Sequence, residues 1–196
     1  MTEVVLASTS ASRRALLEGA GVVFTARSPG VDETAAKAAL LGEGLGPRDI
    51  ADALAELKAV RIRAEGALVI GADQTLDLDG ELIDKAETLD EARERLKRLR
   101  GRPHKLHSGV VVAQAGQPIW REVSTATLWM RPFSDGFLDD YLAREGEHLL
   151  GSVGCYRLED VGVQLFSRIE GDYFTILGLP MLGLLDLLRR HGVLTT

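Results

Sequence analysis

The chain has few of the features that would direct it out of the cytoplasm. It has one cysteine among 196 residues, Cys155, so no intramolecular disulfide can form, which fits a reducing compartment. The first residues, Met1-Thr2-Glu3, lack the basic region and apolar core of a signal peptide. Gly, Asp or Arg interrupts every apolar stretch well before the ~18 residues that a membrane span needs. We therefore expect a cytoplasmic protein without a membrane partner.

The sequence also lacks an excess of basic residues. Its 23 Lys and Arg residues are outnumbered by 29 Asp and Glu residues, which gives a formal net charge of −6 and a pI near 5.3. Because nucleic-acid binding needs a basic surface, often interleaved with aromatic side chains, we expect no nucleic-acid partner. A small anionic substrate remains compatible, since a few cations and a divalent metal in one pocket suffice to bind it.

Several common motifs are missing as well. No two histidines have the spacing of zinc ligands, and nothing matches a Walker A loop or a Rossmann glycine pattern. No repeat or low-complexity linker divides the chain. With 45% hydrophobic and 27% charged residues, the composition suits an ordinary folded protein of one α/β domain or two closely packed lobes.

Alternating strand and helix patterns predict an α/β protein with a mostly buried sheet. Short apolar or alternating runs predict strands over residues 1–7, 22–26, 67–76, 81–83, 107–113, 123–131 and 161–169. Helical periodicity predicts helices over residues 10–19, 48–65, 90–100, 134–144 and 181–191. Asp79-Gly80 indicates a hairpin turn, and Pro29 and Gly30 indicate a loop over residues 28–33.

The most informative segment is the hydroxyl-rich turn between the first predicted strand and the first predicted helix. If Ser10 is the N-cap, Arg13 and Arg14 lie in the first helical turn, where the helix dipole disfavours each exposed cation by roughly 0.3–1 kcal/mol. An anion bound at the free N–H groups of the helix would offset that cost. The alternative is a capped surface helix with two solvated arginines, and this segment alone favours neither.

Asp73 extends a buried apolar strand, although Asp is depleted in strands. Its neighbours Gly71 and Ala72 are small and leave room for a large group to approach the backbone. A buried carboxylate needs a cation, a metal or hydrogen bonds, and an Asp bound only by backbone amides is the alternative. Asp73 could share a divalent metal with Glu33, which by itself is typical of a solvated loop acid.

Three further residues have ordinary structural interpretations. Lys58 lies on the apolar side of the helix over residues 48–65, where a lysine usually extends its charged end to water. Lys85 follows the hairpin strand, where a lysine is usually solvated. Cys155 has no basic neighbour predicted to activate it, so we expect a small buried side chain.

Taken in order, these segments resemble the motifs of the Maf-like nucleoside triphosphate pyrophosphatases. Each motif is weak alone, but their joint order and spacing from Leu6 to Gly192 are specific. The segments are Leu6-Ala7-Ser8-Thr9-Ser10 with Arg13-Arg14 and Leu16-Leu17, Val31-Asp32-Glu33, Lys58-Ala59, Ile70-Gly71-Ala72-Asp73-Gln74, Lys85, Ser108-Gly109-Val110 and Gly178-Leu179-Pro180.

The resemblance implies an ITPase-like fold over residues 1–196. We expect one domain of two packed lobes, with a central mixed sheet flanked by helices and a substrate cleft between the lobes. It implies hydrolysis of a standard or modified nucleoside triphosphate to monophosphate and pyrophosphate with Mg²⁺ or Mn²⁺, as in removal of unwanted nucleotides. It also implies a homodimer. A nucleotide-binding regulator of cell division that does not hydrolyse its ligand is the alternative.

The same similarity assigns roles within the cleft. Asp73 would be the general base, Glu33 and Asp73 would hold the metal, and Lys85 would neutralise the triphosphate near the reacting atoms. The phosphates would bind to Ser8, Ser10, Arg13, Lys58 and, as a ligand or a bystander, Arg14.

Three positions bear on the base that the cleft accepts. The segment Asp73-Gln74 resembles the sequences of the branch that acts on 7-methyl-GTP more than those of the branch that acts on dTTP and UTP. Glu159 falls where the former branch also carries an acid, and its carboxylate could bind a guanine edge. Ser12 stands where 7-methyl-GTP enzymes carry Trp, so it cannot stack on a methylated base. Ala86 stands where the family usually has Pro after the lysine.

Overall fold

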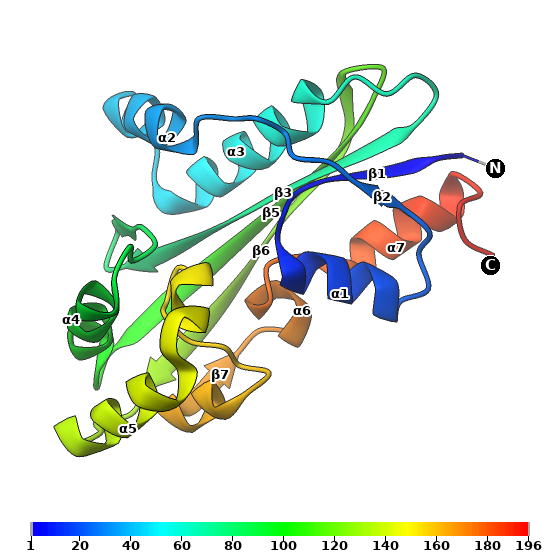
Figure 1. Cartoon of the computed structure of the whole chain (residues 1–196). Helices are drawn as coiled ribbons and strands as arrows, with labels where there is room; N and C mark the ends of the chain where they lie inside the picture. Colours follow the sequence, from blue (N-terminus) through cyan, green and yellow to red (C-terminus); the bar gives the residue numbers. More distant parts are fainter. Residues whose placement is uncertain (1, 196) are drawn as a thin grey trace.

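Within residues 2–195, which the computed structural model describes, seven strands form one mixed sheet (Figure 1). Strand β1 pairs in parallel with β2 and β3, and all other pairs are antiparallel. The strand order is β2-β1-β3-β5-β6-β7, with β4 paired to β3. The strands are β1 (Val4–Ala7), β2 (Thr25–Ala26), β3 (Leu68–Leu78), β4 (Glu81–Ile83), β5 (Pro103–Gln114), β6 (Gln117–Met130) and β7 (Phe166–Glu170). The predicted α/β fold with a mixed sheet flanked by helices is confirmed.

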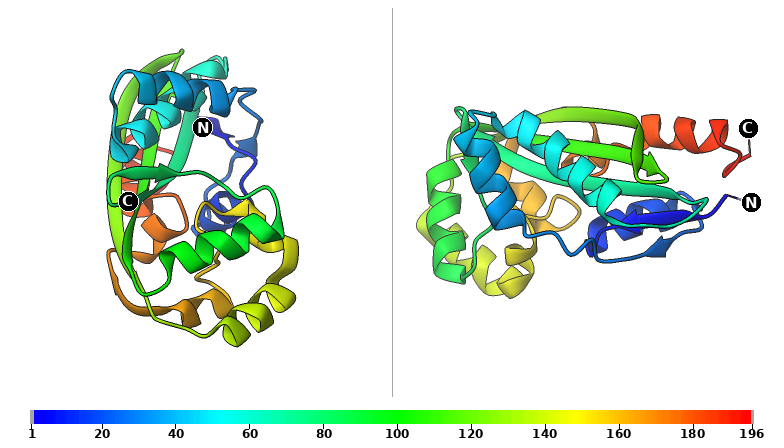
Figure 2. Two further views of the ribbon diagram at one scale, coloured as in Figure 1. Left: turned by 90° about the vertical axis from the view of Figure 1, so that its left-hand side faces the viewer. Right: turned by 90° about the horizontal axis from the view of Figure 1, so that it is seen from above.

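Helices cover both faces of this sheet. Helix α3 crosses one face, whereas α1 and α7 lie on the other face (Figure 1). Helices α4 and α5 lie at the end of the sheet opposite the two chain termini (Figure 2). The helices are α1 (Ala11–Gly19), α2 (Glu33–Gly42), α3 (Pro47–Arg61), α4 (Leu89–Leu99), α5 (Asp135–Glu145), α6 (Tyr173–Ile176) and α7 (Met181–Arg190), with 3-10 segments η1 (Gly146–Gly151) and η2 (Val161–Leu165). No helix within residues 2–195 is long and apolar enough to cross a membrane.

Two glycines let α3 approach the sheet closely. A Cβ on Gly71 of β3 would lie 2.1 Å from the carbonyl oxygen of Ala55, and one on Gly109 of β5 would lie 2.6 Å from that of Ala51. The space beside Asp73 that we attributed to an approaching ligand is therefore filled at Gly71 by this helix. The close approach carries Lys58 of α3 to the sheet surface.

Strand β3 changes its neighbour midway along its length. Its first residues, Leu68–Gly71, pair with β1, and its last residues, 76–78, pair with β4. No strand of the described chain pairs with residues 72–75 on that side, and Asp73 lies within this gap. Because β1 runs parallel and β4 antiparallel to β3, the segments that follow both strands enter the gap from opposite ends. Ligands commonly bind at such a change of strand order, so the topology itself marks a site.

Some predicted elements differ from the structure. The predicted strand over residues 161–169 is wrong in its first half, because Val161–Leu165 forms a 3-10 turn capped by Asp160, and only Phe166–Glu170 is strand. In the predicted strand over 22–26, only Thr25–Ala26 pairs with β1. Helix α2 was not predicted; none of its ten residues is buried, and its sequence shows no apolar stripe of helical period. Met1, part of the first predicted strand, lies outside the described residues, as does residue 196.

Candidate active site

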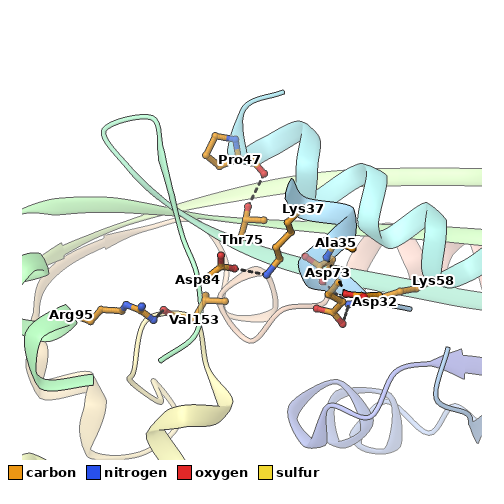
Figure 3. Close-up of polar contacts among 11 residues, drawn as sticks. Asp32, Ala35, Lys37, Pro47, Lys58, Asp73, Thr75, Asp84, Arg95 and Val153 are labelled. Carbon is orange, nitrogen blue, oxygen red and sulfur yellow. Dashed lines mark hydrogen bonds and ion pairs between the residues drawn. The ribbon is translucent and has the colours of Figure 1, made fainter. Parts of the chain in front are cut away.

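Asp73 and Lys58 form a buried ion pair in the gap along β3. The Lys58 Nζ atom donates to Asp73 Oδ1 at 2.6 Å (Figure 3). It also lies 2.8 Å from Glu33 Oε1. The side chains of Lys58 and Asp73 are only 5% and 6% exposed. The interpretation of Lys58 as a lysine that extends to water is therefore wrong, because its ammonium joins carboxylates from α2 and β3.

The second oxygen of Asp73 has no protein partner. Oδ2 is buried, and no described residue hydrogen-bonds to it. Leaving a buried carboxylate oxygen unpaired costs free energy of about 1–3 kcal/mol or more, so such an atom points to a ligand that completes it. The alternative of an Asp held by backbone amides is not supported, because its recorded side-chain partner is Lys58.

Glu33 is the first residue of α2, which Asp32 caps by accepting a 3.0 Å hydrogen bond from the Ala35 amide. Partial burial opposes ionisation of Glu33. The attraction and hydrogen bond of Lys58, with further attraction from Lys37 and Lys85, outweigh burial and lower the pKa of Glu33. Glu33 is therefore a carboxylate held in an ion-pair network rather than a freely solvated loop acid.

The hydroxyl-rich turn folds back on itself before α1. The Oγ atom of Ser10 caps the helix by accepting from the Arg13 amide at 3.4 Å, and Ser8 Oγ accepts from the Ser10 amide at 3.2 Å. The Arg13 side chain donates to Ser8 Oγ at 3.4 Å and to the Gly178 carbonyl at 2.9 Å. Burial lowers the pKa of Arg13, although Asp73 and Glu33 oppose the shift. An arginine stays protonated even so, and this turn therefore places a partly buried positive charge near Asp73.

Lys85 follows β4 and lines the cleft as an exposed cation without a counter-ion, as its position after the hairpin predicts. No ion pair of Lys85 is present in the chain from residue 2 to 195. Burial, followed by repulsion from Arg13 and then Lys58, lowers the pKa of its ammonium. Attraction to Glu33 and Asp73 opposes this lowering of the pKa. A bound anion would relieve this arrangement of crowded positive charges.

These side chains line one cleft of about 760 Å³. That volume is within the usual range for a small-molecule site. Of the predicted site residues, Arg14 does not line the cleft but is exposed, beside Glu18 and Phe24 in a separate shallow depression. The others all line it: Ser8, Ser10, Ser12, Arg13, Glu33, Lys58, Asp73, Gln74, Lys85 and Glu159.

Comparison with known proteins bears directly on this arrangement. A model of the family described as "Maf-like protein" matches residues 3–191. The chain belongs to the Maf-like family. It is 66% identical to a protein of Caulobacter vibrioides named nucleoside triphosphate pyrophosphatase, over 100% of this chain and 98% of the relative. It is 51% identical to a protein of the same name from Granulibacter bethesdensis, covering 98% and 99% of the two chains. It is 50% identical to a 7-methyl-GTP pyrophosphatase of Rhizobium meliloti, over 97% of each chain. The resemblance derived from the sequence is confirmed.

In this Maf-like protein the amide of Gln74 is bound largely by the protein itself. Its Nε2 atom donates to Ser108 Oγ at 3.0 Å and to the carbonyls of Thr175 at 3.0 Å and Ile176 at 2.9 Å. Ser108 Oγ also donates to the Thr175 carbonyl at 2.7 Å. Gln74 therefore fixes α6 against the sheet, just before the Gly178 carbonyl that binds Arg13.

A second group of charged side chains in this Maf-like protein surrounds Arg157. Arg157 lies between three carboxylates, with Glu145 at 3.8 Å, Glu159 at 3.7 Å and Asp160 at 3.6 Å. Arg157 and Glu159 both line the cleft, as does Tyr156, whose hydroxyl lies 2.7 Å from Nε2 of the buried His104. Glu159 was predicted from the sequence, but Arg157 and Tyr156 were not. The partner of Tyr156, His104, is distant in the chain, whereas the local spacing of Arg157 from Glu159 and Asp160 was a detectable signal.

Two carboxylates are available for a metal in the cleft. Nowhere in residues 2–195 do three or more His, Cys, Asp or Glu side chains gather in a metal-binding arrangement. Mg²⁺ fits this donor set nonetheless, because proteins usually bind it through one or two carboxylates together with substrate phosphates. Glu33 and the unpartnered Oδ2 of Asp73 meet that requirement, and the Lys58 ammonium joins the two carboxylates.

Proposed function

We propose that this Maf-like protein hydrolyses a nucleoside triphosphate to the monophosphate and pyrophosphate. The observation that carries the proposal is the buried Asp73 carboxylate, whose Oδ2 lacks a partner, in a cleft that also contains Arg13, Lys58 and Lys85. A cleft with these cations suits a polyanion, and the unpaired oxygen suits a water that must lose a proton. The names of the relatives from Caulobacter vibrioides and Granulibacter bethesdensis support the same activity.

In this proposal Lys58 fixes the carboxylate through Oδ1, and Oδ2 accepts a proton from the water that attacks the α-phosphorus. Arg13 and Lys85 stabilise the negative charge that develops on the departing pyrophosphate. Glu33 would hold Mg²⁺ or Mn²⁺ directly, and Oδ2 of Asp73 would hold it through the bound water that this oxygen deprotonates; the cation would supply Lewis-acid polarisation of the phosphate oxygens. Ser8 and Ser10 would orient the phosphates at the start of α1, and Arg14, which is exposed outside the cleft, would be a bystander.

We further propose that the base lies toward Glu159, whose carboxylate can accept from the donor edge of a guanine. Ser12 and Gln74 border the same cleft, so they are the other candidates to influence base choice. The relative named 7-methyl-GTP pyrophosphatase supports a standard or modified guanine nucleotide as the substrate, as in clearance of non-standard nucleotides. Light scattering would test the proposed cytoplasmic homodimer, which should have twice the chain mass of 21.2 kDa.

The test is a nucleotide panel containing GTP, 7-methyl-GTP, UTP and dTTP, incubated with purified protein and Mg²⁺ while pyrophosphate is measured. We expect release from at least one triphosphate, and Asp73→Asn should remove it while the melting temperature shows a folded protein. Lys97→Met is the matched control, because Lys97 pairs with Glu94 on the surface of α4. A folded protein that releases pyrophosphate from none of these nucleotides would reject the proposal, and binding without turnover would favour the regulator.

A further inference from the structure

Helix α2 brings a further cation, Lys37, to the cleft. Its Nζ atom lies 2.6 Å from Oδ1 of Asp84, which directly precedes Lys85 (Figure 3). Lys37 lines the cleft, and its side chain is only 16% exposed. None of the roles assigned above uses Lys37.

The position of Lys37 follows from that of Glu33. The two residues lie four positions apart on α2, so their side chains share one face of the helix. Glu33 binds Lys58 at 2.8 Å, which turns this face toward the gap along β3. Lys37 also helps to lower the pKa of Glu33, so its charge acts within the same network.

The Lys37–Asp84 pair is unequal in its solvation. Asp84 is 60% exposed, so water can replace Lys37 around its carboxylate at little cost. The lysine, by contrast, is mostly covered and remains beside the cleft when the pair breaks. The Lys58–Asp73 pair differs, because both its side chains are buried and neither can turn to solvent. Lys37 can therefore exchange its carboxylate for another anion more readily than Lys58 can.

We propose that Lys37 binds a phosphate of the substrate and that Asp84 competes with that phosphate in the free protein. This inference rests on the proposed function and extends it with a further binding residue. Asp84 keeps the ammonium at the cleft until the triphosphate arrives, and a charge-assisted hydrogen bond to phosphate then replaces the ion pair. Lys37 therefore favours substrate binding and Asp84 opposes it. Substitution of either residue removes the same ion pair, but the two substitutions should change the affinity for substrate in opposite directions.

The test compares KM and kcat for Lys37→Met and Asp84→Asn on the triphosphate that the wild type hydrolyses best. Loss of one charge-assisted hydrogen bond should raise KM about tenfold in Lys37→Met, and Lys37→Arg should recover most of the loss. Asp84→Asn should lower KM two- to threefold, roughly, because the competing carboxylate is gone. Lys97→Met, which removes a cation from an exposed ion pair on α4, should leave KM unchanged.

A purely structural ion pair would give a different result. Lys37→Met and Asp84→Asn would then change KM in the same direction and lower the melting temperature equally, which would overturn the inference.

Calorimetry with inorganic tripolyphosphate separates this inference from the proposed function, because binding requires no hydrolysis. If the wild type releases no pyrophosphate, the proposed function fails. Weaker tripolyphosphate binding by Lys37→Met and tighter binding by Asp84→Asn would still support the role of Lys37. Equal binding by all variants, or none by the wild type, would refute it.

Discussion

Substitution of Gly71 by Ala tests whether the closeness of α3 to the sheet creates the site. The new Cβ would lie 2.1 Å from the Ala55 carbonyl oxygen and 2.4 Å from the Ala59 amide nitrogen, and both are backbone atoms that no side-chain rotation can move. Ordinary van der Waals separation requires α3 to retreat by about 1 Å, in an interior that is packed as densely as a crystal. We expect a loss of about 1–3 kcal/mol in the free energy of unfolding, the usual cost of overpacking.

The same displacement should reduce catalysis, because Lys58 is carried on α3. A retreat of this size would lengthen the 2.6 Å contact between Lys58 Nζ and Asp73 Oδ1 beyond hydrogen-bond distance. Misplacement of a catalytic group by ~1 Å can cost on the order of 100-fold in rate, so kcat should fall by one to two orders of magnitude.

Urea unfolding and pyrophosphate release would measure both effects of Gly71→Ala. Gly42→Ala is the control, since Gly42 ends α2 and a Cβ there meets nothing within 4 Å. A Gly71→Ala protein with wild-type stability and kcat would refute the reasoning.

Two other predictions concern metal and pH. A chelator should abolish pyrophosphate release, and Mg²⁺ or Mn²⁺ should restore it; full activity in the chelator would contradict a metal role for Glu33 and Asp73. Burial lowers the pKa of His104 from 6.5 to about 4, so between these values the unfolded chain binds a proton that the folded protein does not. The free energy of unfolding should therefore fall by up to about 3 kcal/mol as the pH drops through this window. Urea titrations at pH 7 and pH 4.5 would measure this loss in the free energy of unfolding. The loss should be smaller for His104→Asn than for the wild type or for the exposed control His148→Asn. Equal losses in all three proteins would refute the role of His104.

Features governed by neighbouring residues were predictable from the sequence. Ser10 caps α1 as expected, since its side chain accepts from an amide three residues ahead. Asp79 and Gly80 form the expected hairpin turn, both with positive φ, as a two-residue turn of this type requires. Family membership was also accessible, because the order of the motifs is a property of the sequence alone.

Contacts between distant segments were not predictable. The pattern that placed Lys58 on the apolar side of a helix could not show that Asp73 and Glu33 would meet its ammonium there. That meeting depends on the close approach at Gly71, which the sequence suggested as space for a ligand. Lys37 was missed because α2 has no apolar stripe, although the cap at Asp32 and the four-residue spacing from Glu33 were detectable signals.

The buried Lys58–Asp73 pair is better explained by chemistry than by stability. Removing two charges from water costs several kcal/mol for each ion, and apolar residues of similar volume often serve a core equally well or better. An ion pair retained for stability would also use both carboxylate oxygens, whereas Oδ2 of Asp73 remains without a partner. Along β3, only the stretch between the β1 and β4 pairings has an open edge through which a ligand can reach this atom. The open edge of β3 and the unpartnered Oδ2 therefore have the same explanation. The site requires an Asp73 carboxylate that Lys58 holds rigidly through one oxygen and that a ligand can reach at the other.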